Sequence, residues 1–263
     1  MGLDSVLAGC GAAAEAILIL LMLRVRLFRT FPAFQIWVCW SFVIDTYYFF
    51  AVTFQKLQPS LNLYEVQISV DSILMFGVLV ELAWSVLRPI RTSLPKNSWL
   101  AIVGLILIAG TAVWFVAGLA APGYLTPEGK AFFRLQQTGA ILRVVVFLAM
   151  AGFSQLLSIG WRNRELQIAT GFGFYSIVSL AVTILHTHQA STSPQYHWLD
   201  EAGAASYLLA LCYWVFAFAT REAERKEFTP QMQNFLLAAA GTARAARIGM
   251  ASSSSRDSRK SDD

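Results

Sequence analysis

The amino-acid sequence predicts an all-α, polytopic membrane protein with seven transmembrane helices, its N-terminus outside and its C-terminus in the cytoplasm. Of the 263 residues, 56% are hydrophobic and only 14% are charged, whereas roughly a quarter of an average soluble domain is charged. The apolar residues form repeated runs of about 20, enough to cross a hydrocarbon core of roughly 30 Å as helix. Lys and Arg gather between these runs, mostly in alternate loops. A soluble fold of this length could not bury so much apolar surface.

Seven runs are long enough to be spans. They are expected at residues 5–23, 32–54, 66–87, 98–120, 132–159, 166–187 and 201–220. The first run has no basic residue before it and three arginines after it, which is the reverse of a secretory signal peptide, so it is expected to remain as a span. Pro, Gly, Ser and Asn separate later runs in the segments LQPSLN, RPIRTSLPKN, APGYLTPEG and QASTSPQ, where helices stop.

Two spans carry local patterns of their own. The second ends in the aromatic run Tyr47 to Phe50, which indicates either ordinary packing or the wall of a pocket. The sixth begins with GFGFY, in which Gly171 and Gly173 lie two residues apart and resemble no phosphate-binding loop. Glycine in a membrane helix allows a neighbouring helix to approach closely, so these two residues predict a close helix contact.

The basic residues predict the orientation of the chain. Sixteen Lys and Arg follow the odd-numbered spans, eight of them in the tail after residue 220, and three follow the even-numbered spans. By the positive-inside rule, the N-terminus is outside and the tail is cytoplasmic. The formal charge of +4 is therefore a topology signal. The lipid bilayer is the expected partner, and nucleic acid is not.

The chain divides into three segments by composition. Residues 1–227 form the seven-helix transmembrane domain, and residues 251–263, SSSSRDSRKSDD with the preceding alanine, form a disordered Ser-rich tail. Between them, residues 228–250 begin with Thr229 as a helix N-cap and Pro230 in the first turn. This segment is either an amphipathic helix on the anionic inner leaflet or a frayed helix.

An internal repeat is one interpretation of the loops. RVRLFRTF and WRNREL lie about 135 residues apart, as do VLRPIR and ATREAER, which would give a three-plus-one-plus-three plan of helices. Residue identity between the halves is slight, and alternating topology alone would produce the same match.

Five ionisable side chains fall inside the expected spans: Glu15, Asp45, Asp71, Glu81 and Arg143. Even insertion-based scales assign roughly 2.5 to 3.5 kcal/mol to a charged group at mid-membrane. Each of the five is therefore expected to face other helices or water. Because acids outnumber bases, at least one carboxyl is expected to hold its proton.

Depth suggests partners for these groups. At 1.5 Å per residue, Glu15 and Arg143 each lie roughly 15 Å from the outer surface, and Asp45 is slightly shallower. We therefore expect a buried ion pair between Arg143 and Asp45, with Glu15 as the other candidate acid, because an unpaired guanidinium at that depth cannot lose its charge.

A ligand or proton pathway is the functional interpretation of the remaining groups. Asp71 and Glu81 lie ten residues apart on the third span, and both can face the bundle. Gln155 of the fifth span has a depth similar to that of Glu81, and Glu15 completes the candidate pathway. The alternative is that these side chains only hydrogen-bond across helices and fix the packing.

Several other functions are disfavoured by the sequence. No lysine lies inside a span, which excludes a retinal Schiff base. The three histidines, His186, His188 and His197, gather near the outer side without a pattern typical of a metal or haem site, so no metal and no cofactor is expected. The cysteines form no pair or CxxC. No catalytic motif is present in a suitable context, and no residue is expected to be catalytic.

Some features together resemble a group of uncharacterised bacterial seven-helix integral membrane proteins. They are Tyr64 before a helix with Glu81 and then Arg88-Pro89, WRNREL running into the GFGFY segment, and a last helix with Tyr207 and Trp214. The resemblance spans roughly residues 20 to 220. It implies the fold and a bacterial inner membrane, and it carries no catalytic role.

The leading functional hypothesis is sensing of a small ligand or proton in the outer half of the bundle, relayed to a cytoplasmic signalling partner. The alternative is a small-solute or proton-coupled transporter in which Asp71 and Glu81 open alternately to the two sides. An enzyme using the outer His and acidic residues is the third hypothesis and is less favoured.

Overall fold

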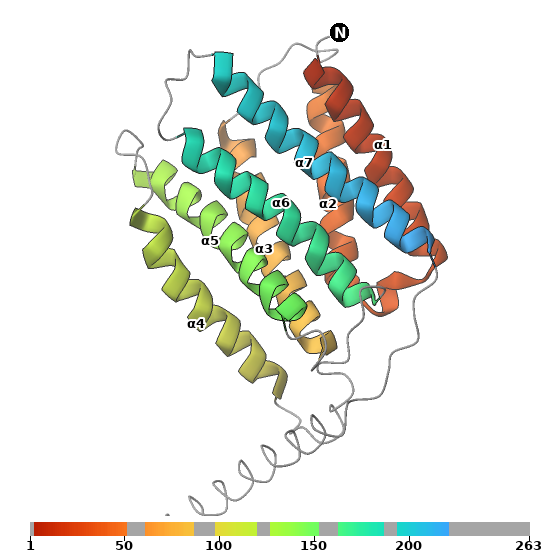
Figure 1. Ribbon diagram of the computed structural model, residues 1–263, viewed down its shortest axis with the longest axis vertical. Coiled ribbons are helices and arrows are strands. Elements are labelled where there is room, and N and C mark those ends of the chain that lie inside the picture. The colour runs from red at the N-terminus through yellow and green to blue at the C-terminus, as the bar shows by residue number, and fades with distance from the viewer. Residues whose placement is uncertain are drawn as a thin grey trace, which may run out of the picture.

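Seven long α-helices pack side by side in the structure, a computed structural model (Figure 1). It describes residues 3–51, 61–86, 98–119, 127–152, 163–186 and 194–220. Within these ranges the elements are α1 (Leu3–Arg24), the 3-10 helix η1 (Leu27–Arg29), α2 (Pro32–Phe50), α3 (Leu61–Val86), α4 (Ser98–Leu119), α5 (Pro127–Gly152), α6 (Arg164–His186) and α7 (Pro194–Ala219). The all-α class predicted from the sequence is confirmed.

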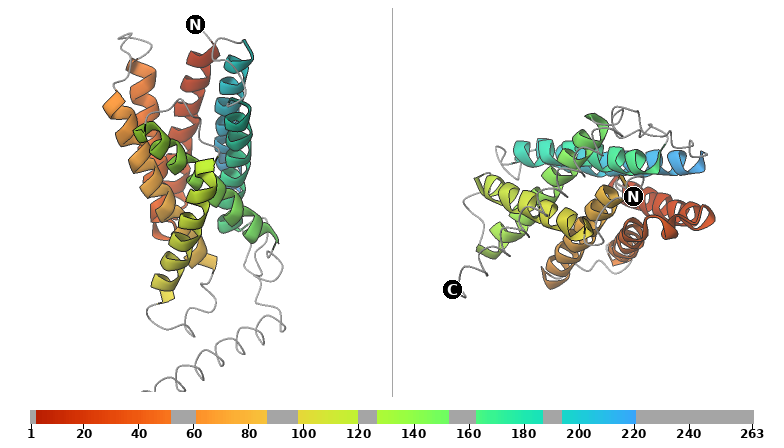
Figure 2. Two further views of the ribbon diagram at one scale, coloured as in Figure 1. Left: turned by 90° about the vertical axis from the view of Figure 1, so that its left-hand side faces the viewer. Right: turned by 90° about the horizontal axis from the view of Figure 1, so that it is seen from below.

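Six of the helices form a ring, and α4 lies outside it. Around the ring, α1 contacts α2, α2 contacts α3, α3 contacts α5, α5 contacts α6, α6 contacts α7, and α7 returns to α1. Seen from below, α6 and α7 lie along one side of the bundle and α1, α2 and α3 along the other (Figure 2). Helix α4 packs on α3 and α5. The ring therefore encloses a central space that draws side chains from six helices.

Six of the helices in the described ranges are long and apolar enough to cross a membrane, so the chain is a multi-pass membrane protein by length and composition. The exception among the described helices is α2, which has 19 residues but carries Gln35, Asp45, two tryptophans and two tyrosines. These side chains lower the mean hydropathy of α2, although the helix is long enough to be a span. Its place in the ring between α1 and α3 agrees with a seventh span, which stays a prediction.

The helices α3, α5 and α7 begin five to seven residues before the predicted starts of their spans, at residues 61, 127 and 194 against 66, 132 and 201. A hydropathy pattern marks only the part of a helix that lies in hydrocarbon. The backbone hydrogen bonds continue into the polar first turns, such as Pro-Glu-Gly-Lys in α5. The tail segments predicted at residues 228–250 and 251–263 lie outside the described residues.

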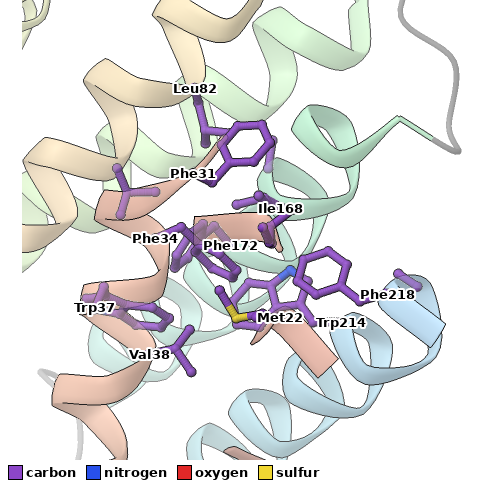
Figure 3. Close-up of a cluster of buried hydrophobic side chains, with 14 of the residues drawn as sticks. Met22, Phe31, Phe34, Trp37, Val38, Leu82, Ile168, Phe172, Trp214 and Phe218 are labelled. Carbon is purple, nitrogen blue, oxygen red and sulfur yellow. The ribbon is translucent and has the colours of Figure 1, made fainter. Parts of the chain in front are cut away.

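The tightest packing is in the half of the bundle where α1 ends, which we call the closed half. Five aromatic rings meet there, from Phe34 and Trp37 of α2, Phe172 of α6, and Trp214 and Phe218 of α7 (Figure 3). The Phe172 centroid lies 4.9 Å from those of both Trp37 and Trp214, with edge-to-face geometry. Such pairs add about 0.5–1.5 kcal/mol each beyond the burial of their area. This aromatic cluster fills the ring of helices.

Glycines in α6 make the cluster possible. A Cβ placed on Gly171 would lie 2.3 Å from Nε1 of Trp214, and one on Gly173 would lie 2.4 Å from Cγ of Phe147. Both distances are far below van der Waals contact, so α5 and α7 approach α6 across surfaces that only glycine provides. The close helix contact predicted from the GFGFY segment is confirmed.

We predict that Gly171→Ala destabilises the protein by about 1–3 kcal/mol, because the new methyl group overlaps a tryptophan that is itself closely packed. Unfolding in mixed detergent micelles measures the loss. Gly104→Ala on α4 is the matched control, since its Cβ would meet no atom within 4 Å, and it should be neutral or slightly stabilising. Equal stability of the two variants would contradict this account of the contact.

Candidate functional site

A cavity of about 630 Å³ occupies the half of the bundle where α1 begins. We call it the polar cavity. All six helices of the ring contribute to its wall, and the aromatic cluster lies toward the other end of the same helices. The ionisable and aromatic side chains that line it are Trp37, Trp40, Asp45, Tyr48, Tyr64, Asp71, Arg143, Tyr175, Asp200, Glu201 and Tyr207. Four carboxyl groups and one guanidinium therefore line one cavity.

Glu15 of α1 is completely buried beside the polar cavity, with 0% of its surface exposed. The hydroxyl of Tyr207 donates to its Oε1 atom at 2.5 Å. The Asp45 carboxyl lies close enough to interact with that of Glu15 and with the Tyr207 hydroxyl. The Tyr207 ring in turn packs against that of Tyr175, with centroids 5.4 Å apart. The two acids of α1 and α2 thus meet at one tyrosine of α7.

Asp71 of α3 is hydrogen-bonded to a tryptophan of α2. The indole Nε1 of Trp37 donates to its Oδ1 atom at 2.6 Å. Since Trp37 also belongs to the aromatic cluster, this bond joins the floor of the polar cavity to the packed core of the closed half.

Arg143 of α5 lines the polar cavity together with Asp71, and the two charges attract each other. Its guanidinium also lies over the Tyr175 ring, 5.4 Å from the centroid. The sequence predicted Asp45 or Glu15 as its acidic partner, and this pairing stays a prediction; the acid whose charge acts on Arg143 in the structure is Asp71. The prediction compared depths only. Helix rotation turns the Asp45 carboxyl toward α1 and α7 instead.

Two buried donors of the polar cavity have no hydrogen-bond partner among the described residues. They are Nε1 of Trp40 and Nε of Arg143. Leaving a buried donor unpaired costs about 1–3 kcal/mol. Both donors would gain from an acceptor, such as a carboxylate or phosphate oxygen, that entered the cavity.

Glu81 does not line the polar cavity. Its Oε1 accepts the backbone N–H of Ala33, and its Oε2 accepts that of Phe34, each at 3.0 Å. These are among the first N–H groups of α2, which a helix leaves without intrahelical partners. The residue before α2, Phe31, provides no side-chain cap. Glu81 therefore caps a different helix, and its charge also favours the positive end of the α2 dipole.

A second polar cluster closes the other end of the bundle, and sequence reasoning missed it. Arg164, at the start of α6, is 3% exposed and donates to the carbonyls of Ala217 at 2.6 Å and Thr220 at 2.8 Å. These are carbonyls of the last turn of α7. Beside it, the Ser85 hydroxyl of α3 donates to Glu165 at 2.9 Å.

The sequence counted Arg164 only as a basic loop residue. The signal that could have revealed its role is that polar residues continue from it into an apolar helix, with Glu165 one position and Gln167 three positions further on. Residues three apart on a helix can meet, and Arg164 donates to Oε1 of Gln167 at 3.0 Å.

Other predicted sites lie outside the part of the chain that is described. Gln155 is among those residues, as are the side chains of all three histidines. Among the described residues, no group of three or more His, Cys, Asp or Glu side chains could hold a metal ion.

In comparisons with known proteins, the chain matches no family model, and no curated protein or solved structure is significantly similar to it.

We predict that Arg143→Met destabilises the protein and that adding Asp71→Asn restores part of the loss, because the second change removes the buried acid left without its positive neighbour. Asn still offers an oxygen to the Trp37 indole. A double-mutant cycle on unfolding in detergent should give a coupling energy of about 0.5–3 kcal/mol. Asp45→Asn is the matched control. Rescue by Asp45→Asn, but not by Asp71→Asn, would contradict this prediction and support the pair of Arg143 with Asp45 that depth predicts.

We predict that Glu81→Gln destabilises the protein by about 1–3 kcal/mol, because an amide can accept only one of the two N–H groups and turns its own donor toward the other. Hydrogen exchange at the Ala33 and Phe34 amides should accelerate in parallel. Glu128→Gln is the control, since Glu128 is exposed at the start of α5 and surface changes stay within about 0.5 kcal/mol. Unchanged exchange at both amides would contradict the capping role.

Proposed function

We propose that this chain is a ligand-binding sensor of a bacterial inner membrane, and that the polar cavity binds a small zwitterionic solute and relays binding to a cytoplasmic partner. The observation that carries the proposal is that one cavity combines an excess of carboxyl groups with two buried donors that lack a partner. An ammonium group would balance the excess of carboxyl groups, and an anionic group would accept from the two donors.

The lining of the cavity suits an ammonium ion. Four carboxyl groups face one guanidinium, so a cation entering the cavity lowers the local excess of negative charge. Tryptophan and tyrosine rings also line it, and ring faces attract quaternary ammonium groups by cation–π interaction. A cation alone would leave the donors of Arg143 and Trp40 unpaired, whereas a zwitterion meets both requirements.

Size and place support the same proposal. The volume of about 630 Å³ lies within the range of roughly 300–1,000 Å³ that small-molecule sites occupy. With the orientation predicted by the positive-inside rule, the polar cavity lies in the outer half of the bundle. A solute would then enter from outside the cell.

The relay is supported by a continuous chain of contacts from the cavity to the opposite end. Asp71 accepts from the Trp37 indole, and the Trp37 ring packs against Trp214, with centroids 6.0 Å apart. Phe34 links Trp214 to Phe218, with ring centroids 5.3 and 6.1 Å from its own. The Phe218 ring lies under the Arg164 guanidinium, 5.1 Å from the centroid. Arg164 holds the last turn of α7. A partner at that end would respond to movement of α7.

Transport of a small solute is the second candidate. The position of α4 outside the ring favours it, because a three-plus-one-plus-three plan would place the middle helix apart from two groups of three. Against it, Glu81 is engaged in capping α2, and the aromatic cluster fills the path beyond the cavity. Uptake of the same solute into proteoliposomes separates transport from sensing.

We predict that glycine betaine, which joins a trimethylammonium group to a carboxylate, binds the purified protein more tightly than choline or acetate does. At 100 times its dissociation constant, a ligand stabilises the folded state by about 2.7 kcal/mol, which thermal unfolding detects. Trp37→Phe should keep this binding but weaken its effect on hydrogen exchange at residues 163–167, because the variant removes the bond to Asp71 and keeps a ring in the cluster.

Matched glycine variants control this experiment. Gly203 lines the polar cavity, and its Cβ would meet no atom within 4 Å, so Gly203→Phe should fill the cavity and abolish binding. Gly104 lies on α4, away from the cavity, and has the same free space, so Gly104→Phe should bind normally. Binding that is lost equally in both variants, or that neither changes, would overturn the proposed site.

A further inference from the structure

A second cavity, of about 620 Å³, lies between α3, α4 and α5. We call it the apolar crevice. Its wall is almost entirely apolar, with Ile73, Phe76 and Leu79 from α3, Ile106, Leu107 and Trp114 from α4, and Leu142 from α5 among the lining residues. Ile73 and Leu107 are 70% and 53% exposed. Because the outer faces of these helices meet lipid, the crevice opens toward the acyl chains of the bilayer.

The apolar crevice and the polar cavity share a wall. Ser72 and Met75 of α3 and Leu135 and Gly139 of α5 line both. The partition is thin, since Gly139 has no side chain and a Cβ there would meet no atom within 4 Å. A narrow passage between α3 and α5 at this level would join a charged volume inside the bundle to an apolar one facing lipid.

We propose that the ligand of the polar cavity is a zwitterionic amphiphile with an alkyl chain, which enters sideways from the bilayer. The head group lies in the polar cavity, and the chain passes between α3 and α5 at Gly139 into the apolar crevice. This inference rests on the proposed function, since it requires the polar cavity to bind the head group. It goes beyond that function because it names the ligand class and the entry route.

Polarity and continuity together favour this occupant over others. A fully polar solute would leave the apolar crevice to ordinary lipid, and a bilayer lipid chain alone would not use the donors and acids on the other side of Gly139. An amphiphile satisfies both volumes in one molecule. Its concentration in the membrane also exceeds that in water, so the passage is supplied from the side on which the crevice opens.

The test compares three probes on the full chain in lipid nanodiscs: glycine betaine as the head alone, dodecyl dimethylglycine as head and chain, and dodecanol as the chain alone. The alkyl betaine should bind on the order of tenfold or more tightly than glycine betaine. Gly110 lines only the apolar crevice, and its Cβ would be in ordinary contact, 3.6 Å from Leu142 Cδ1. Gly110→Phe should bring the ratio of the alkyl betaine affinity to the glycine betaine affinity toward one.

Two further variants keep the test interpretable. Thr111 also lines the apolar crevice alone, so Thr111→Trp should lower the ratio even if Gly110→Phe fails to fold. Gly104→Phe, one to two turns away on the same helix and outside both cavities, should keep the full ratio. Partition of the probe into lipid is identical for all variants, so differences in ratio report the protein.

The outcomes separate this inference from the proposed function. A ratio near one in the unmodified protein, with glycine betaine still bound, overturns the amphiphile and leaves the solute site standing. A high ratio that Gly110→Phe and Thr111→Trp leave unchanged also overturns it, because membrane partition alone would then explain the gain. If dodecanol bound as tightly as the alkyl betaine, the head group would add nothing to binding. The apolar crevice would then be a general lipid site, and the amphiphile proposal would be overturned. Failure of every head-group probe would instead reject the proposed function.

Discussion

Hydrocarbon offers no hydrogen bonds, so a charged side chain at bilayer depth must find its partners inside the protein. For several of the described residues these partners are neutral donors and acceptors. Glu81 takes two N–H groups from the start of α2, Glu15 takes a tyrosine hydroxyl, Asp71 takes an indole, and Arg164 donates to the last turn of α7. Each of these bonds joins two different helices, and the bond from Tyr207 to Glu15 joins the last helix to the first. Together they fix which face of each helix turns inward.

The same constraint divides the bundle into two unlike halves. In the closed half, polar groups sit at helix ends, where free N–H and carbonyl groups accept them, and the interior is left to aromatic rings that pack against Gly171 and Gly173. In the other half, carboxyl groups arise in mid-helix, where backbone groups are already paired. They are held by side chains and a cavity remains. The cavity thus follows from where along the helices the charges occur.

Much of this architecture could be predicted because bilayer thickness sets the length of apolar runs and loop charge sets their direction. The inward orientation of the five ionisable groups could be predicted from the free-energy cost of placing a charged group in hydrocarbon. Their partners could not, because a sequence gives the depth of a residue but not the rotation of its helix. Arg143 was therefore assigned to Asp45 or Glu15 at a similar depth, whereas Asp71 is the acid whose charge acts on it in the structure. The cap provided by Glu81 required knowing that the first turn of α2 lies against α3.

Trp37 is the point at which the two halves meet, and its chemistry explains how they could communicate. An indole has one donor, and here that donor is committed to Asp71 at 2.6 Å. An ammonium group that approached Asp71 would compete for the same carboxylate and weaken the bond. The Trp37 ring is packed edge-to-face against Phe172 and Trp214, and a close-packed core cannot absorb a ring movement locally. Release of one hydrogen bond in the cavity would therefore be felt along α6 and α7, the two helices that Arg164 joins at the opposite end.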